Sequence, residues 1–286
     1  MRSQTLRHRL HKREVLVVPA AYDMVSAKLI EITGFEAVYL SGFGQSASHL
    51  GLPDVGLMTM SEMAERVHNM ARSVKIPVIA DGDTGYGGII NVRRTIQEFE
   101  QVGAAGIQLE DQESPKKCGH TLGRHVVPEK EMIRKIEAAI GSRRSDDFII
   151  IARTDARTTL GLNKAIHRGR LYEKAGADVI FVESPESKEE LRQIAESFSV
   201  PVMANIIEGG RTPLCTVKEL EKMGFKMVAF ALTALLAAAF GVREAMRILK
   251  QEGSTQSLLD HLMDFRTFQD LIGFPDVWDF EKRFSH

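Results

Sequence analysis

Short apolar runs alternate with longer amphipathic stretches along the chain. About eight of these runs are rich in β-branched residues, and they lie at positions 15–18, 37–40, 78–80, 106–109, 148–151, 179–182, 202–204 and 227–230. Continuous apolar runs of this length are typical of strands in a parallel sheet that is covered on both faces. The stretches between them predict helices, and repeated strand-then-helix units indicate a parallel α/β fold.

Several of the predicted helices carry a recognisable start. A Ser or Thr followed three residues later by Glu is the signature of a capping box, and it occurs at positions 59–62, 187–190 and 216–219. Pro128 stands where another helix can begin. About eight such units in fewer than 300 residues favour a closed (β/α)8 barrel of the TIM type over an open doubly wound sheet. No Gly-x-Gly-x-x-Gly follows the first run, which disfavours dinucleotide binding.

Residues 1–286 contain no low-complexity linker, so we expect a single barrel domain. The apolar run at 227–242 is shorter than a membrane-spanning helix requires, and it predicts a buried strand that turns directly into a buried helix. Residues 251–286 predict a C-terminal helical tail rich in aromatic side chains, including Phe265, Trp278 and Phe284. An exposed aromatic surface needs a cover, which is either the chain's own barrel or a neighbouring subunit.

Composition narrows the function classes. The formal net charge of −1 over 286 residues gives no electrostatic basis for binding nucleic acid or an anionic membrane. The chain has 2 cysteines, Cys118 and Cys215, so disulfides are not expected to hold the fold together. No apolar segment follows the basic N-terminus as it would in a secretory signal. These features predict a soluble, cytoplasmic protein.

Polar residues follow most of the predicted strands, and in a barrel these positions meet at one mouth. Asp81 and Asp83 stand two apart in an extended segment, which places both side chains on one side. Glu110 follows the next strand, and three hard oxygen donors of this kind suit Mg²⁺, or Mn²⁺ in its place. The alternative, that an aspartate caps the next helix, suits one residue better than the whole cluster.

Two other strand ends predict an anion site. The segment Ser41-Gly42-Phe43-Gly44 can present backbone N–H groups to an anion. Arg153 is a stronger candidate because its planar guanidinium matches a carboxylate. The alternative for Arg153 is a salt bridge to Asp155 or Glu183. The predicted partner is therefore a small anionic carboxylate.

The segment 113–124 is polar, contains two glycines and a proline, and follows the fourth predicted strand. These properties predict a mobile lid over the barrel mouth. Cys118 lies in it beside Lys116, Lys117 and His120, and neighbouring positive charge is expected to lower the pKa of its thiol. Cys215, in contrast, fits a small buried hydrophobic residue.

The motif Lys116-Lys117-Cys118-Gly119-His120 resembles the cysteine signature of the isocitrate lyase / phosphoenolpyruvate mutase superfamily. The resemblance extends over nearly the whole chain, and its further motifs are Tyr39-Leu40-Ser41-Gly42, Gly51-Leu52-Pro53-Asp54, Asp81 to Gly87, Glu110-Asp111-Gln112, Ala152 to Ala156 and Asn205 to Pro213. It is nearest to the methylisocitrate lyase, 2,3-dimethylmalate lyase and carboxyphosphonoenolpyruvate phosphonomutase groups.

The resemblance implies a (β/α)8 barrel, a Mg²⁺ ion, and a homotetramer in which the last helix swaps between paired subunits. It also implies a role for individual residues. The metal would be held by Asp81 and Asp83, with Asp54 and Glu110 acting through water. Cys118 would be the general acid. The substrate would be contacted by Ser41, Gly42, Phe43, Gly119, His120, Arg153, Glu183 and Asn205.

Departures from the methylisocitrate lyase pattern bear on the substrate. This chain has Phe43, Ile207 and Leu236 where those enzymes have a glycine, a threonine and an arginine, so partners for a third carboxylate are missing. The expected reaction is therefore retro-aldol cleavage of a substituted malate to pyruvate or a related 2-oxo acid and a short carboxylate. The favoured substrate is a malate such as 2,3-dimethylmalate, and 2-methylisocitrate is the less favoured one. Tyr39 is a candidate base. The alternatives are phosphonomutase activity, oxaloacetate hydrolysis or decarboxylation, and a non-catalytic metabolite-binding barrel.

Overall fold

Residues 2–285, which the computed structural model describes, form eight parallel strands that close into one barrel in chain order. The strands are β1 (Leu16–Ala21), β2 (Val38–Leu40), β3 (Val78–Asp81), β4 (Gly106–Glu110), β5 (Ile149–Thr154), β6 (Val179–Val182), β7 (Val202–Ile206) and β8 (Met227–Phe230). β1 closes the ring by pairing with β8, and Leu16 lies opposite Met227. The (β/α)8 prediction is confirmed, and every predicted run overlaps a strand.

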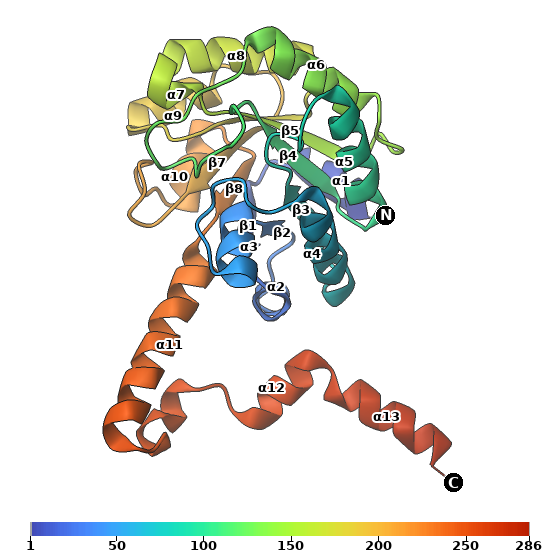
Figure 1. Ribbon diagram of the computed structural model, residues 1–286, viewed down its shortest axis with the longest axis vertical. Coiled ribbons are helices and arrows are strands. Elements are labelled where there is room, and N and C mark those ends of the chain that lie inside the picture. Colours follow the sequence, from blue (N-terminus) through green and yellow to red (C-terminus); the bar gives the residue numbers. More distant parts are fainter. Residues whose placement is uncertain (1, 286) are drawn as a thin grey trace. The chain divides into compact units, whose positions relative to one another are not determined.

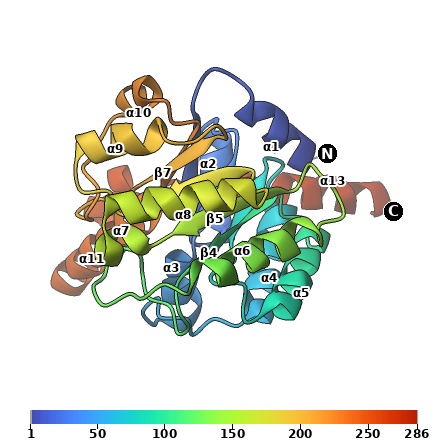
Figure 2. The same ribbon diagram turned by 90° about the horizontal axis from the view of Figure 1, so that it is seen from above.

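Helices follow the strands and surround them (Figures 1 and 2). The helices of the barrel are α1 (Arg2–Leu10), α2 (Met24–Ile32), α3 (Gly42–Gln45), α4 (Met60–Ser73), α5 (Ile89–Gln101), α6 (Glu129–Ile140), α7 (Ala156–Leu160), α8 (Leu162–Lys174), α9 (Lys188–Ala195) and α10 (Val217–Met223). A short π-helix at Ser46–Leu50 follows α3 directly.

The predicted capping residues stand at the helix starts. Thr59 and Glu62 form a reciprocal box, in which Glu62 Oε2 accepts the Thr59 N–H at 2.7 Å. The same box forms at Thr216. At Ser187 only the forward bond forms, because the Glu190 carboxylate instead accepts from the Glu186 N–H and pairs with Arg157. These caps satisfy backbone donors that the first turn leaves free.

Side chains alternate along each strand between two apolar layers. In β5, Ile149 and Ile151 point into the barrel, where they join a cluster that also contains Leu6 and Leu10 of α1. Ile150 points outward and packs in the larger layer between strands and helices. α4 contributes buried Met63, Val67 and Met70 to that outer layer, and in Figure 2 the helices ring the strands. The period-two alternation of strands and the one-sided helices together produce this double core.

The chain divides into two compact units, Met1–Thr233 and Ala234–His286. The second unit contains most of α11 (Thr233–Glu252), a 3-10 helix (Gln256–His261), α12 (Phe265–Ile272) and α13 (Phe274–Phe284). The expected helical tail is present, but the helical unit begins well before residue 251. The expectation of a buried helix after β8 is wrong for the single chain, since no residue of α11 is buried within it. Among residues 2–285, no helix is both long and apolar enough to cross a bilayer.

Candidate active site

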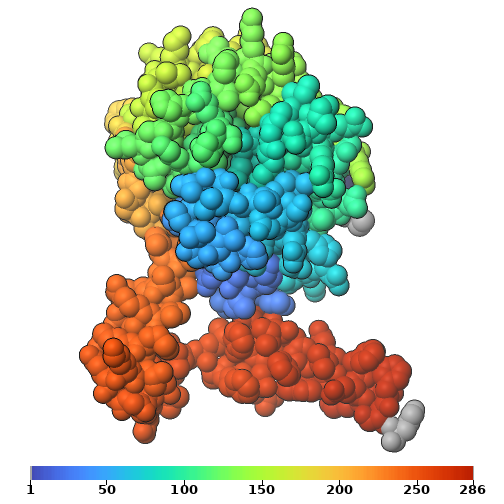
Figure 3. All heavy atoms as spheres, in the orientation of Figure 1, coloured from blue at the N-terminus to red at the C-terminus, as the bar shows by residue number. Residues whose placement is uncertain are grey.

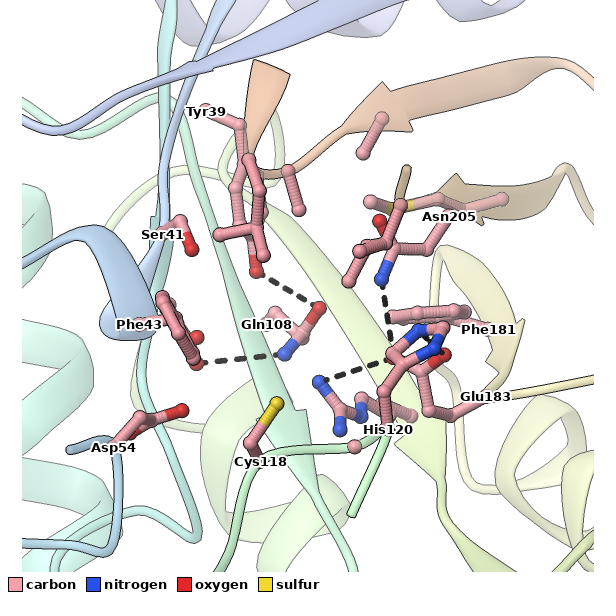
Figure 4. Close-up of a pocket in the computed structure, with 18 residues that line it drawn as sticks. Tyr39, Ser41, Phe43, Asp54, Gln108, Cys118, His120, Phe181, Glu183 and Asn205 are labelled. Carbon is pink, nitrogen blue, oxygen red and sulfur yellow. Dashed lines mark hydrogen bonds and ion pairs between the residues drawn. The ribbon is translucent and has the colours of Figure 1, made fainter. Parts of the chain in front are cut away.

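A small cavity of about 40 Å³ opens where the strands end at their carboxyl termini (Figure 4). It is lined by Tyr39, Ser41, Phe43, Asp54, Asp81, Gln108, Cys118, Gly119, His120, Arg153, Phe181, Glu183, Met203, Asn205, Ile207, Ala229, Ala231 and Leu232. Most of the residues that the sequence nominated are in this lining. Gly42, Asp83 and Glu110 are not, although each contacts a residue that is.

Asp81, the last residue of β3, and Asp83, two residues later, are held by backbone and side-chain donors. Asp81 Oδ2 accepts the N–H of Gly42 at 3.1 Å, and Asp81 Oδ1 accepts the N–H of Asp83 at 3.1 Å. A Cβ on Gly42 would lie 2.8 Å from Asp81 Oδ2, so this approach requires glycine. Asp83 has φ of 47°, a left-handed conformation that few non-glycine residues adopt. The segment after β3 is therefore built to hold both carboxylates.

Lys116 is the main residue of this site that sequence reasoning did not assign to it. Its ammonium is buried and lies 2.6 Å from Asp54 Oδ1 and 2.8 Å from Asp83 Oδ1. Burial alone would lower the pKa of Lys116, but Asp83 and Glu110 raise it well above its ordinary value. Lys116 therefore stays charged and ties the lid, defined here as residues 113–124, to the carboxylates.

The carboxylates of the site outnumber its cations. Burial, together with Asp81 and Asp54, raises the pKa of Asp83 to about 6, although Lys116 opposes the rise. Burial also raises the pKa of Glu110 well above its usual range, against the effect of Arg153. Glu110 Oε1 is buried without a hydrogen-bond partner. Clustered carboxylates that resist ionisation lack countercharge, and a hard divalent cation would supply it.

Within the described part of the chain, no three carboxylate, imidazole or thiol groups converge closely enough to enclose a metal ion alone. Mg²⁺ commonly takes one or two carboxylates directly and keeps several waters, so a closed cage is not required. The surplus of buried carboxylates and the unpartnered Glu110 oxygen fit such an ion. Assignment of Asp81, Asp83, Asp54 and Glu110 to a metal remains a prediction.

Arg153, at the end of β5, is held from both sides. Its Nε lies 2.9 Å from Asp155 Oδ2, and its Nη1 lies 3.3 Å from Glu110 Oε2 and 3.5 Å from Glu183 Oε2. Its guanidinium stacks over Phe181 at 5.3 Å. The salt bridges that the sequence left as an alternative are thus formed. Since Arg153 also lines the cavity, the same contacts that hold it also orient it for an anion.

Tyr39 lines the cavity, and its hydroxyl donates to Gln108 Oε1 at 2.8 Å (Figure 4). Burial, with the nearby charge of Asp81, raises the pKa of Tyr39 well above its ordinary value. The phenol therefore stays protonated at neutral pH. This environment argues against the role of base that the sequence proposed and suits a hydrogen-bond donor.

Cys118 has a raised pKa, opposite to the expected direction. Burial is the largest cause, and the charge of Asp54 adds to it. The expectation failed because the two lysines face elsewhere: Lys116 pairs with Asp54 and Asp83, and Lys117 Nζ donates to Gly123 O at 2.9 Å. A thiol with a raised pKa keeps its proton at neutral pH, which suits an acid better than a nucleophile.

The lid is seated against the barrel. In the space-filling view, residues near 54 and residues near 118 lie side by side (Figure 3), and the Cys118 N–H donates to Asp54 O at 3.1 Å. At the far end of the lid, the fully buried Arg124 donates to Asp155 Oδ1 at 2.5 Å and also to Thr158. The predicted position of the lid over the strand ends agrees with these contacts; its mobility stays a prediction.

Glu183 organises the side of the cavity formed by β6 and β7. Although burial favours its protonated form, Arg153 and His120 lower the pKa of Glu183 overall, so it is ionised. Asn205 Nδ2 donates to Glu183 Oε2 at 3.2 Å, which leaves Asn205 Oδ1 buried without a partner. An unpartnered acceptor beside a cavity is available to a donor on a ligand.

Five apolar residues of the lining were not among the substrate-binding residues expected from the sequence. Phe181, Met203, Ala229, Ala231 and Leu232 come from β6, β7 and β8 or the residues after them. Their alternation with outward-facing core residues was the available signal, since it predicts which strand residues point inward. Gln108 was available by the same reasoning on β4.

Comparisons with known proteins identify the family of the chain. Residues 6–250 match the phosphoenolpyruvate phosphomutase family. The chain is 45% identical over 280 residues to 2,3-dimethylmalate lyase from Eubacterium barkeri, covering 98% of this chain and 97% of that protein. Oxaloacetate acetylhydrolase in complex with the inhibitor 3,3-difluorooxalacetate has a similar structure, with a TM-score of 0.93, 36% identity, and coverage of 98% of this chain and 96% of that one.

A further solved structure, phosphonopyruvate hydrolase in complex with oxalate and Mg²⁺, gives a TM-score of 0.90 at 30% identity and covers 99% of both chains. The closed barrel with a charged mouth defines a (β/α)8 enzyme. The chain belongs to the phosphoenolpyruvate phosphomutase family, and thereby to the isocitrate lyase / phosphoenolpyruvate mutase superfamily of lyases and mutases. The resemblance seen in the sequence is confirmed.

Proposed function

We propose that this enzyme cleaves the C2–C3 bond of a 2-hydroxy dicarboxylate, a malate substituted at C3, to a 2-oxo acid and a short carboxylate. The observation that carries the proposal is the pairing, around one cavity, of a protonated thiol at Cys118 with a fixed guanidinium at Arg153. Cleavage of this kind needs an anion clamp and an acid that delivers a proton to carbon. The similarity of the chain to 2,3-dimethylmalate lyase supports this class of substrate.

Mg²⁺, with Mn²⁺ as a substitute, would be held by Asp81 and Asp83, with Asp54 and Glu110 reaching it through water. When bound, such an ion polarises the oxygens of a 2-hydroxy acid and balances the buried carboxylates. The structurally similar phosphonopyruvate hydrolase binds oxalate and Mg²⁺, which supports the choice of metal.

The residues of the chain bind and orient the substrate. Arg153 pairs with one carboxylate, and the hydroxyl of Ser41 and the Asn205 amide are placed in the lining to hydrogen-bond the polar end. Phe43, Ile207 and Leu232 are apolar lining residues, which favour alkyl groups at C3. A third carboxylate against them would be buried without a partner, at high cost.

Bond cleavage starts when the hydroxyl at C2 gives its proton to a solvent water at the cavity mouth. That oxygen becomes the carbonyl of the 2-oxo acid, while the electrons of the C2–C3 bond move onto C3 and its carboxylate. Arg153 stabilises that charge. The Cys118 thiol then gives its proton to C3, which completes the short carboxylate product, and solvent returns the released proton to the Cys118 thiolate.

The test is a panel of 2-hydroxy and 2-oxo dicarboxylates incubated with enzyme and Mg²⁺. We expect a 2-oxo acid product from C3-alkylated malates and a much lower rate with 2-methylisocitrate. Turnover only of oxaloacetate or of a phosphonate would replace the lyase proposal with the alternative that the sequence kept open. Oxaloacetate is included because of the structural similarity to oxaloacetate acetylhydrolase.

We also propose that the chain works as a homotetramer in which the C-terminal unit packs on a second copy. No residue of α11, α12 or α13 is buried within the described chain, and Phe240, Phe265 and Phe280 are more than half exposed. Apolar surface of this kind marks an interface. Light scattering should show a tetramer that truncation before Phe265 disrupts; a monomeric full-length protein would contradict this.

A further inference from the structure

On the side of β6 and β7, the lid is held by two residues that lie outside the cavity lining, Ser184 and Arg211. Ser184 Oγ donates to Gly119 O at 2.7 Å, and the Arg211 N–H donates to His120 Nδ1 at 2.9 Å. His120 Nε2 lies 3.2 Å from Glu183 Oε1. Because Nδ1 accepts a hydrogen bond, the ring proton lies on Nε2 and faces the carboxylate. Two consecutive lid residues after Cys118 are therefore fixed.

Ser184 has an unusual backbone. It is fully buried, and its φ of 59° places it in the left-handed region. Its own N–H donates to Glu183 Oε1 at 2.7 Å. Non-glycine residues rarely hold this conformation unless the surrounding contacts enforce it, and such residues cluster at functional sites. Here the conformation brings the hydroxyl to the lid carbonyl.

The approach of the lid also depends on two glycines. A Cβ at Gly119 would lie 2.4 Å from Arg153 Nη2 and 2.8 Å from Glu183 Cγ. A Cβ at Gly210 would lie 2.6 Å from His120 Nδ1. The lid therefore lies against the residues after β6 and β7 at two points where a side chain would clash. This close approach requires glycine at position 119 in the lid and at position 210 after β7.

We propose that Ser184 and the backbone at Gly210–Arg211 form a latch that holds the lid closed and thereby positions Cys118. They are positioning residues: Ser184, Gly210 and Arg211 are outside the cavity lining and act through Gly119 and His120. The role of Cys118 as an acid rests on the proposed function, but the closing of the lid does not. The two can therefore fail separately.

The experiment measures lid opening directly by amide hydrogen exchange, without a substrate. In the full-length protein, Ser184→Ala removes the donor to Gly119 O, and Gly210→Ala places a methyl group against His120. Ser187→Ala is the matched control, because Ser187 lies in the same connection after β6 and caps α9 without touching the lid. Strands β4 and β5 provide the internal reference.

Loss of one hydrogen bond should speed exchange of the Cys118 amide about fivefold in Ser184→Ala. Gly210→Ala should have a larger effect, and trypsin should cut faster after the exposed Lys117 in both variants. Exchange in β4 and β5 should match the wild type in every variant, and exchange and cleavage of the lid in Ser187→Ala should also match it. Wild-type lid exchange in both variants would overturn the latch, and faster exchange throughout the barrel would show a merely structural role.

Kinetics add a second readout. With the best substrate, Gly210→Ala should lower kcat on the order of tenfold to a hundredfold while KM changes less, because Cys118 is misplaced and the substrate contacts of the barrel remain. A tenfold to hundredfold rise in KM with constant kcat would count against a role of the latch in positioning Cys118. If no substrate is turned over, the proposed function fails, and the exchange measurements still decide the latch.

Discussion

Each barrel strand has an apolar part that is buried in the two core layers, here called the wall, and a polar end at the barrel mouth. The wall and the mouth have opposite properties. In β5, Ile149, Ile150 and Ile151 are buried in apolar layers. Arg153, two residues further along the same strand, is buried in a salt bridge with Asp155, which follows the strand. Full burial of one such isoleucine contributes roughly 1.5–3 kcal/mol to folding. The buried charges of the mouth oppose folding unless each has a partner.

The pKa of Asp83 shows the sign of this opposition. Burial raises it from 3.8 to about 6, so the fold prefers the protonated form. Stability from this group is present at low pH and is lost as the pH rises through that interval. At neutral pH the ionised carboxylate therefore destabilises the fold, and the wall offsets it. Within a strand such as β5, the apolar segment therefore stabilises the fold, and the charged segment that follows it supplies the polar groups of the site.

The largest expected effect comes from removing a mouth carboxylate. Asp81→Ala or Asp83→Ala should reduce activity by about 10⁴-fold or more, because the cation that balances the site would be lost. The melting temperature of Asp83→Ala should not fall, because the ionised carboxylate of Asp83 destabilises the fold at neutral pH. Titration calorimetry with Mg²⁺ and thermal unfolding would check both parts. Full activity in excess chelator, with metal-free protein confirmed, would contradict the metal assignment.

The next effect concerns the acid. Cys118→Ser replaces the thiol with a hydroxyl that gives up its proton far less readily. We expect kcat to fall by roughly 10²–10⁴-fold with little change in KM. Steady-state kinetics would be compared with Cys215→Ser, in which a buried cysteine away from the cavity is changed. Near-normal kcat in Cys118→Ser would end the proposed proton transfer while leaving the barrel and the metal site untouched.

A change in the wall should give the opposite result. Ile150→Ala removes a fully buried side chain of the outer layer and should lower the free energy of unfolding by roughly 2–5 kcal/mol. The kcat of the folded fraction should stay within about twofold. Denaturant unfolding and kinetics at low temperature would test this. A large loss of kcat in folded protein would show that the wall and the mouth are not separable.

The smallest expected effect is on thiol reactivity. Because burial raises the pKa of Cys118, the thiolate population at pH 7 should be lower than in an ordinary cysteine. In Cys215→Ser protein, alkylation by iodoacetamide should be slow at neutral pH and should rise only above the ordinary thiol range. Mass spectrometry would follow the reaction. Rapid alkylation at pH 7 would contradict the raised pKa of Cys118 and support the lowered pKa that the sequence predicted.

The sequence predicted the wall well because the wall follows local rules. Apolar runs located every strand, and the Thr59 and Thr216 boxes began helices where expected. The residue types of the mouth were also evident, since Asp81, Cys118 and Arg153 stand at strand ends or in the lid. The predicted pKa shift of Cys118 was wrong because the sequence does not show where the neighbouring side chains point. Lys116 and Lys117 are close to Cys118 in sequence, yet Lys116 pairs with two aspartates and Lys117 donates to a backbone carbonyl. Side-chain direction depends on the tertiary fold.

One carboxylate ties the end of the lid to Arg153, the residue proposed to bind the substrate. Asp155 accepts from Arg124 through Oδ1 and from Arg153 through both oxygens. Two arginines that depend on one acceptor cannot vary independently, so the cost of changing either should depend on the other in a double-mutant cycle. We therefore expect Arg124, Arg153 and Asp155 to change together during evolution, because replacing one of them leaves a buried charge on another without its partner. Such coupling would restrict the routes by which this lid can acquire a new sequence.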